Sequence, residues 1–157
     1  MARQLRIQYP GALYHVMSRG NGHQDIFFSN NDRIAFLKNL EGCIKTHNFI
    51  CHAYCLMDNH YHLLIETPDA NLSDVMRDIN GNYTQTFNKR KGRVGHLMQD
   101  RYKAHVIEKD TYLLEVARDI VLNPIRAKIV DHPDKWRWSS YKTTGGIIRS
   151  PKWLSTD

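Results

Sequence analysis

The chain has 157 residues, of which 41% are hydrophobic, and its 22 Lys and Arg against 16 Asp and Glu give a formal net charge of +6. This length fits one domain with one core, and the basic surplus favours a polyanionic partner such as nucleic acid over an acidic protein or a neutral metabolite. Three cysteines indicate a reducing cytosol rather than a disulfide framework, and no apolar window approaches the length of a membrane span, so we expect a cytoplasmic protein without a membrane partner.

In chain order, the apolar pattern predicts strand, helix, strand, strand, helix, strand and helix. The strands are expected at residues 12–18, 49–57, 61–67 and 102–107, and the helices after Asn31-Asp32 as far as Ile44, at 72–89 with an interruption at Gly81, and at 111–122 after Asp110. Cys51 and Cys55 are four residues apart on one predicted strand, so both thiols should lie on the same face as small buried groups.

The first six elements match a split βαβ arrangement, which predicts an α+β, ferredoxin-like fold. In this fold a four-stranded antiparallel sheet carries helices, and here an extra C-terminal helix would follow. We expect one domain over residues 1–144, onto which Trp136, Trp138 and Tyr141 pack back, and a C-terminal tail over residues 145–157.

Two pairs of polar residues stand out within apolar surroundings. His60 and His62 are two apart on a predicted strand, so both imidazoles point to one face and are close enough to share an ion. Asp119 and Asn123 are four apart on a mostly apolar helix, so they share one face of it. A bare pair of histidines is more often an unliganded pair on a strand, and a polar helix face is often simply solvated, so the residues alone leave both interpretations open.

Several separated motifs nevertheless resemble the REP-associated tyrosine transposases, a group of the single-tyrosine HUH transposases. These motifs are Met57–Ile65, Gly95–Arg101, Ile120–Ala127 and Trp136–Tyr141, and the similarity runs from about Tyr9 to Tyr141. The resemblance implies a ferredoxin-like fold, a divalent metal ion, Mg²⁺ or Mn²⁺, and a single-stranded DNA hairpin with a flanking guide sequence as partner. A monomer is favoured over a dimer.

The same resemblance assigns roles to residues. His60 and His62 match the two metal-binding histidines of the family, and Asn123 matches the third metal ligand. Asp119 occupies the position of the nucleophilic tyrosine. A carboxylate is shorter than a phenol, and its attack on phosphorus would give a mixed acyl phosphate that is prone to hydrolysis, so we predict that cleavage is lost.

Two alternatives stay open. The chain could be a hairpin-binding protein without catalysis, or a metal-dependent phosphodiesterase that uses activated water with Asp119 as ligand or base. Tyr112 and Tyr83 are weaker candidates for a replacement nucleophile, because Tyr112 is two helical turns from Asp119 and Tyr83 lies on another helix.

Basic residues interleaved with aromatic ones suit a folded single strand, because cations meet phosphates and rings stack on bases. A charge run alone is usually a solvated face, and the family resemblance shifts this interpretation toward DNA. Arg3 and Arg6 could extend the predicted contact surface. The predicted DNA-contacting residues are Arg19, Asn21, Tyr83, Lys89, Arg90, Lys91, Arg93, Arg101 and Lys103.

Overall fold

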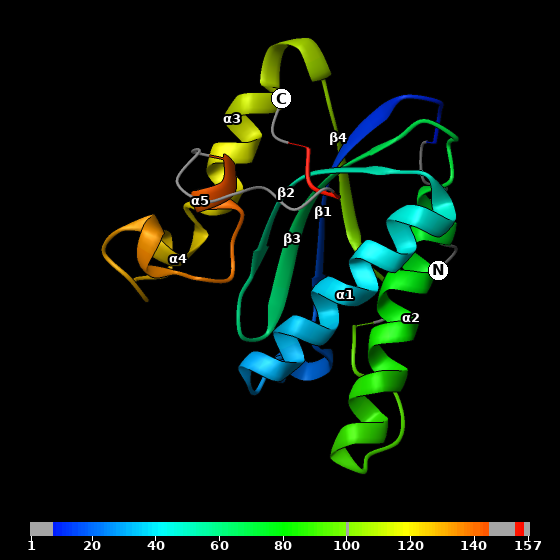
Figure 1. Ribbon diagram of the computed structural model, residues 1–157, viewed down its shortest axis with the longest axis vertical. Helices are drawn as coiled ribbons and strands as arrows, with labels where there is room; N and C mark the ends of the chain where they lie inside the picture. The colour runs from blue at the N-terminus through cyan, green and yellow to red at the C-terminus, as the bar shows by residue number, and fades with distance from the viewer. Residues whose placement is uncertain (1–7, 100, 145–152, 156–157) are drawn as a thin grey trace.

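The computed structural model describes residues 8–99, 101–144 and 153–155 of the chain (Figure 1). Four strands form one antiparallel sheet in the order β2-β3-β1-β4, which confirms the predicted α+β, ferredoxin-like arrangement. The elements are β1 Ala12–Arg19, η1 Asn21–His23, α1 Asn30–His47, β2 Ile50–Leu56, β3 His60–Thr67, α2 Leu72–Lys91, β4 Lys103–Ile107, α3 Lys109–Val121, α4 Asn123–Arg126, η2 Pro133–Lys135 and α5 Tyr141–Thr144.

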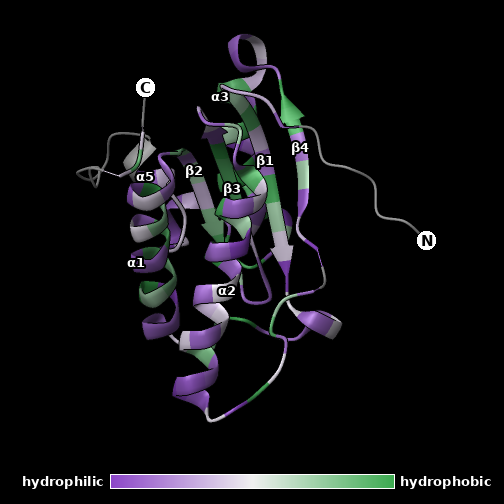
Figure 2. Cartoon of the chain, turned by 90° about the vertical axis from the view of Figure 1, so that its right-hand side faces the viewer, coloured by the Kyte–Doolittle hydropathy of each residue, from purple (hydrophilic) through white to green (hydrophobic). Residues whose placement is uncertain are grey.

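The sheet separates two layers of helices. α1 and α2 lie side by side against one face, and α3 lies against the other (Figure 1). Figure 2 shows α1 and α2 in front of the sheet with many hydrophilic residues along their ribbons. Side chains alternate between the two faces along each strand, so Val16 and Leu63 enter the larger core under α1 and α2, whereas Leu13 and Leu64 enter the smaller core under α3.

α2 is continuous through Gly81, contrary to the predicted interruption. Its buried stripe repeats every four residues, at Val75, Ile79, Tyr83 and Phe87, and this packing holds the helix together although glycine is a poor helix former. α1 also begins slightly earlier than predicted, because the hydroxyl of Ser29 accepts a hydrogen bond from the backbone N–H of Asp32 at 3.3 Å.

The two strand cysteines lie on opposite faces of the sheet, so the prediction of one shared face is wrong. The pairing of β2 with β3 shifts between Cys51 and Ala53, which is the signature of a β-bulge. The extra residue places Cys51 in the core under α1 and α2, while Cys55 packs under α3. Both are buried free thiols, and burial raises the pKa of each to about 12, so they are inert groups of the core.

The C-terminal part packs back onto β2 as expected. The backbone N–H of Leu56 donates to the carbonyl of Trp138, and the indole of Trp136 donates to the carbonyl of Leu56 at 3.1 Å. Within the predicted tail, the backbone N–H of Ser155 donates to the carbonyl of Cys51 at 2.9 Å, whereas residues 145–152, 156 and 157 lie outside the described part. The domain boundary at residue 144 therefore stays a prediction. Among the described helices, none is long and apolar enough to cross a membrane.

Candidate metal centre and nucleic-acid interface

The predicted histidine pair lies at the start of β3, on the face that α3 covers. His60 and His62 have ring centroids 5.0 Å apart. The turn before them is fixed at several points. The carbonyl of Asp58 accepts hydrogen bonds from the backbone N–H groups of Ile26 and Phe27, and its carboxylate pairs with Arg33 at 2.6 Å. The turn therefore holds the first histidine in a set place.

Each imidazole has one nitrogen engaged. His60 Nδ1 lies 2.7 Å from Oδ1 of Asn59, and His62 Nδ1 lies 3.0 Å from Nε2 of His15 on β1. In both rings this leaves Nε2 without a hydrogen bond among the described residues. A metal-binding histidine usually has a hydrogen bond on its other ring nitrogen, which fixes the tautomer and the orientation of the ring. Burial, reinforced by His60 and His15, lowers the pKa of His62 to about 3, so the ring is neutral, as ligation requires.

The sequence motifs did not reveal His15. Its position on the α3 face follows from the alternation along β1, but its contact with His62 depends on how β1 pairs with β3, where His62 lies opposite Met17. Burial and the neighbouring His105 lower the pKa of His15, and Asp119 partly opposes them. The carboxylate of α3 therefore acts on the histidine cluster from the helix side.

Asp119 lies near the end of α3, beside the residues that anchor the helix. Ala117 and Ile120 pack into the smaller core under α3, whereas Asp119 lies between them in sequence and is partly exposed. Its carboxylate forms an ion pair with Arg126 at 3.0 Å, and its side chain is 48% exposed. The carboxylate is thus already occupied by a cation of this chain.

Asn123 is the first residue of α4, directly after α3 and Leu122. Its amide nitrogen donates to the carbonyls of Asp119 and Ile120, at 3.3 and 3.1 Å, which caps the end of α3 and leaves the amide oxygen without a hydrogen bond among the described residues. Among all the residues that the structure describes, no three His, Cys, Asp or Glu side chains are grouped so that they could hold a metal ion. The free oxygen of the Asn123 amide is a ligand type that suits hard divalent cations.

Comparison with known families identifies the chain. The family model described as "Transposase IS200 like" matches residues 8–120. The chain belongs to the IS200-like transposase family. The match includes the histidine pair and Asp119 but ends before Asn123.

The fold of this IS200-like chain is shared with solved structures. A REP-associated tyrosine transposase bound to a REP hairpin superposes with a TM-score of 0.78 at 17% sequence identity, covering 100% of this chain and 93% of the other. A structure designated as a candidate transposase from Deinococcus radiodurans R1 gives a TM-score of 0.53 at 13% identity, covering 78% of this chain and 97% of the other. No curated protein sequence matches the chain significantly.

One predicted DNA contact of this IS200-like chain is wrong. Tyr83 is 1% exposed, and its hydroxyl donates to the backbone carbonyl of Ile26 at 2.6 Å. Its ring lies among Phe27, Phe36 and Phe87 in the core, so it is not available to stack on a base or attack a phosphate. The four-residue spacing from Ile79 and to Phe87 was a sequence signal for this burial.

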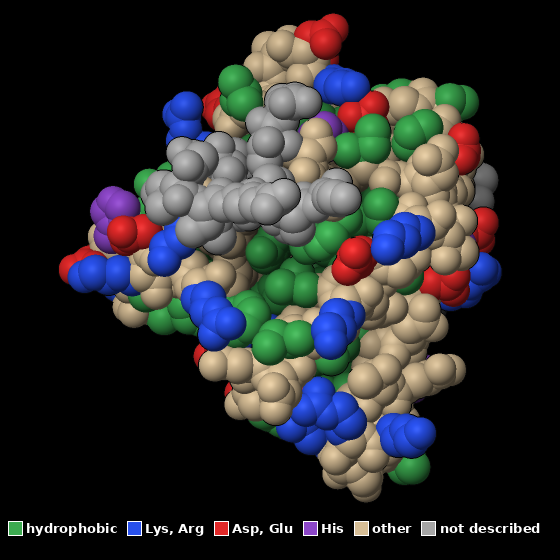
Figure 3. Space-filling view, in the orientation of Figure 1, with side chains coloured by type: hydrophobic (Ala, Val, Ile, Leu, Met, Phe, Trp, Pro, Cys, Tyr) green, Lys and Arg blue, Asp and Glu red, His purple; other side chains and the backbone are tan. Residues whose placement is uncertain are grey.

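A first group of predicted DNA-contacting cations lies at the end of α2. Figure 3, which has the orientation of Figure 1, shows several Lys and Arg side chains at the lower end of the molecule, where α2 ends. Arg90 and Lys91 form ion pairs with the buried carboxylate of Asp32, at 3.2 and 3.3 Å, so part of their charge is used within the protein. Arg93 donates to Asn88 at 2.6 Å, and Lys89 is exposed.

A second group surrounds the C-terminal end of β1. Arg19 lies opposite His60 in the sheet and donates to the side chain of Gln99 at 3.2 Å. Lys103 begins β4 and is exposed. Asn21 and Arg101 line a groove beside them. Arg3 and Arg6 lie outside the described residues. The predicted cations therefore form two separate groups, of which only the second borders the histidine pair.

Proposed function

We propose that this chain is an HUH-type protein of the REP-associated kind that binds a single-stranded DNA hairpin with a flanking guide sequence. It holds Mg²⁺ or Mn²⁺ through His60, His62 and Asn123, and it forms no covalent DNA link because Asp119 stands at the nucleophile position. The observation that carries this proposal is that each of the two imidazoles has Nδ1 engaged, while its Nε2 has no hydrogen bond among the described residues.

The donor set fits a divalent ion. Two imidazole nitrogens come from β3, and one amide oxygen comes from the start of α4, where its own nitrogen is tethered to the end of α3. The amide oxygen and a DNA phosphate favour magnesium or manganese over a softer ion. When bound, such an ion stabilises negative charge on the oxygens of a phosphodiester. The chain's own residues fix the ligands before any DNA arrives.

Asp119 disfavours covalent attack for two reasons. Its side chain is shorter than that of tyrosine, and its carboxylate is paired with Arg126. An ionised carboxylate at this place would also repel an incoming phosphate. The same ion pair counts against the hydrolase alternative, because the carboxylate oxygen faces Arg126 and would have to turn from it to face a water molecule or the ion.

The DNA partner is proposed from three observations. The family is a transposase family, the REP-associated tyrosine transposase of the same fold was solved bound to a REP hairpin, and this chain has a net charge of +6. We expect a monomer whose affinity for the hairpin falls as salt rises, because each neutralised phosphate releases counterions.

The test is to restore the nucleophile by Asp119→Tyr. A hairpin selected from a library with randomised stem and flanks is labelled and incubated with MnCl₂, and adducts are read on a denaturing gel. We expect no adduct with the natural chain and a shifted band with Asp119→Tyr, since the phenol gains reach and Arg126 is freed toward the phosphate. Asp119→Phe is the matched control, because it supplies the ring without the oxygen and should give no band.

The outcomes separate the alternatives. Binding without an adduct in Asp119→Tyr would favour the protein that only binds hairpins. Free cleavage products from the natural chain, lost in Asp119→Asn, would favour the hydrolase. An Asn123→Ala change added to Asp119→Tyr should weaken the restored adduct, because one oxygen ligand is removed.

A further inference from the structure

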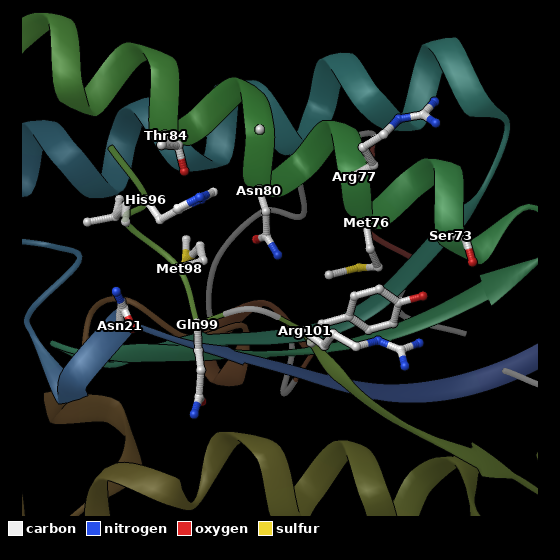
Figure 4. Close-up of a pocket in the computed structure, with 13 residues that line it drawn as sticks. Asn21, Ser73, Met76, Arg77, Asn80, Thr84, His96, Met98, Gln99 and Arg101 are labelled. Carbon is white, nitrogen blue, oxygen red and sulfur yellow. The ribbon is translucent and has the colours of Figure 1, made fainter. Parts of the chain in front are cut away.

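Arginines reach the surface in different parts of the molecule. Arg77 and Arg101 line a groove of about 680 Å³ between α2 and residues 96–102 (Figure 4). Arg126 lies elsewhere, in α4, which follows directly after α3. Its side chain is exposed, and its ion-pair partner among the described residues is Asp119. Arg126 is therefore the arginine that stands beside the predicted nucleophile position.

The backbone of α4 holds Arg126 in a fixed place. The backbone N–H of Ala127 donates to the carbonyl of Asn123 at 2.9 Å. Pro124 is buried, and its carbonyl accepts a hydrogen bond from the backbone N–H of Ile129 at 3.0 Å. The turn is thus closed by its own hydrogen bonds, so the side chain of Arg126 can change its partner without a change in the backbone.

The guanidinium of Arg126 and the amide of Asn123 meet at one residue, Asp119. Arg126 Nη1 donates to the backbone carbonyl of Asp119 at 3.4 Å, and Asn123 Nδ2 donates to the same oxygen at 3.3 Å. Arg126 Nη2 donates to the carboxylate of Asp119 at 3.0 Å. The guanidinium therefore lies beside the amide that supplies the proposed third ligand, where a phosphate in contact with the ion would come.

The carboxylate of Asp119 also acts on the histidine cluster. Burial and the neighbouring His105 lower the pKa of His15, and Asp119 opposes them. His15 Nε2 lies 3.0 Å from His62 Nδ1. A phosphate that enters the site therefore meets a repulsive charge on Asp119 and an attractive charge on Arg126, and these two charges now neutralise each other.

The ion pair is of a kind that forms and breaks easily. The side chain of Arg126 is 56% exposed and that of Asp119 is 48% exposed, and exposed pairs contribute little to stability because water screens them. The planar guanidinium has several N–H groups and fits two oxygens of a phosphate at once. Arg126 is therefore chemically suited to a phosphate, and the carboxylate of Asp119 is the group that occupies it.

We propose that Arg126 is a phosphate-binding residue of the candidate metal centre, and that Asp119 is an internal competitor that occupies it. In the natural chain the carboxylate keeps the guanidinium from the phosphate, so Asp119 weakens DNA binding as well as removing the nucleophile. This inference rests on the proposed function, because the phosphate belongs to the DNA strand that enters the same centre.

The test removes the charge of Asp119 by Asp119→Asn, which keeps the shape of the side chain. The matched control is Glu41→Gln on α1. Glu41 is 42% exposed and pairs with Lys45 at 3.5 Å, and α1 lies against the other face of the sheet (Figure 1). Both variants change the net charge equally. The probe is a fluorescein-labelled hairpin with thymidine flanks, and binding is read by fluorescence anisotropy over a range of salt concentrations, in EDTA so that no ion contributes.

We expect Asp119→Asn to bind the probe about tenfold more tightly, the size of one hydrogen bond to a charged group. The slope of log affinity against log salt should steepen by about one, as for one added phosphate contact. Glu41→Gln should change neither quantity. The thermal midpoints of both variants should stay close to that of the natural chain, because both ion pairs are exposed.

Arg126→Ala then shows whether the gain passes through the arginine. Added to Asp119→Asn, it should cost about tenfold in affinity and return the salt slope to its original value. In the natural chain it should cost much less, because the guanidinium is held by Asp119. Lys45→Ala, the matched control for the cation, should cost the same with and without Glu41→Gln.

The two losses caused by Arg126→Ala decide the assignment. A larger loss when Asp119→Asn is present supports the competition. Equal losses with and without Asp119→Asn, or a gain that Glu41→Gln reproduces, would show that only the overall charge matters and would overturn it.

Failure of this inference is distinguishable from failure of the proposed function. If the natural chain prefers the hairpin to a blunt duplex and Asp119→Asn gives no gain, the competition is overturned while hairpin binding stands. If no chain prefers the hairpin, but Arg126→Ala still costs more when Asp119→Asn is present, the proposed function fails while Arg126 remains a phosphate-binding residue.

Discussion

The two faces of the sheet carry different kinds of residues. The face under α1 and α2 is closed by large apolar rings, with Phe36, Tyr61 and Tyr83 all fully or almost fully buried. The face under α3 has a smaller apolar patch, and beyond it lie His15, His60 and His62. One strand can therefore contribute to the apolar core and to the histidine cluster at the same time, since alternate residues of β3 point to opposite faces.

The difference predicts that stability and metal binding can be changed separately. Side chains under α1 and α2 should affect unfolding and leave the ion site intact, whereas the histidines should affect the ion site and leave the fold intact.

Replacing both His60 and His62 with alanine should abolish measurable Mn²⁺ binding, because the two nitrogen ligands are lost together. Isothermal titration calorimetry of the metal-free chain measures this directly. The thermal midpoint should stay close to that of the natural chain, since neither ring belongs to the large core. Unchanged Mn²⁺ affinity would refute the metal assignment.

Phe36→Ala should lower the free energy of unfolding by about 3–5 kcal/mol, the usual cost of removing a buried phenylalanine. Its ring is 0% exposed and contacts Phe27, Tyr61 and Tyr83. Urea unfolding measures the loss. Mn²⁺ affinity at a temperature where the variant is folded should match the natural chain, and a parallel loss of metal affinity would show that the two faces are not separable.

His15→Ala should weaken Mn²⁺ binding about 10–100-fold, the usual range when a residue that hydrogen-bonds to a metal ligand is removed. His15 lies 3.0 Å from His62 Nδ1, so it orients that ring. His15→Gln keeps a hydrogen-bonding group there and should recover part of the affinity. A simple structural role would lower the thermal midpoint without changing the calorimetric affinity.

Lys109→Met should lower the stability at neutral pH by about 1 kcal/mol, since it removes a hydrogen bond to a mostly buried carboxylate. Burial alone raises the pKa of Glu66, but its contacts with Lys109 and His52 outweigh this and lower it below the ordinary value of 4.5. The unfolded state therefore binds more protons as the pH falls.

The stabilisation by Lys109 should decrease at acidic pH. The contribution of Lys109 is present above pH 4.5 and is lost as the pH falls through the lowered pKa of Glu66. Urea unfolding of both chains between pH 7 and pH 3 should show the two stabilities converging. A constant difference across this range would mean that Lys109 acts through packing rather than charge.

Much of the fold could be predicted from local pattern. The alternation in β1, the short apolar run in β3 and the helical spacing in α1 and α3 place these elements within a few residues of where they lie. The order of elements then limits the topology. These features are encoded along the chain, so a single sequence suffices to find them.

The misplaced features depend on partners that are distant in sequence. The bulge beside Cys51 exists only in the pairing of β2 with β3, and the contact of His15 with His62 spans 47 positions. The ion pair of Asp119 with Arg126 spans only seven positions, but it forms only because α4 turns back on α3. Tyr83 differs, because its apolar spacing was visible and only its proximity to basic residues suggested DNA.

The turn at Asp58 and Asn59 has a further consequence. It is tied to β1 through the bond from Gly20 to the carbonyl of Asn59, and to α1 through Arg33. The loop that precedes His60 is therefore held in place by the protein itself, so ordering the chain would add little entropic cost to the binding of an ion at the proposed site. Because no new apolar surface is buried in that step, the heat capacity of the protein should hardly change on binding the ion.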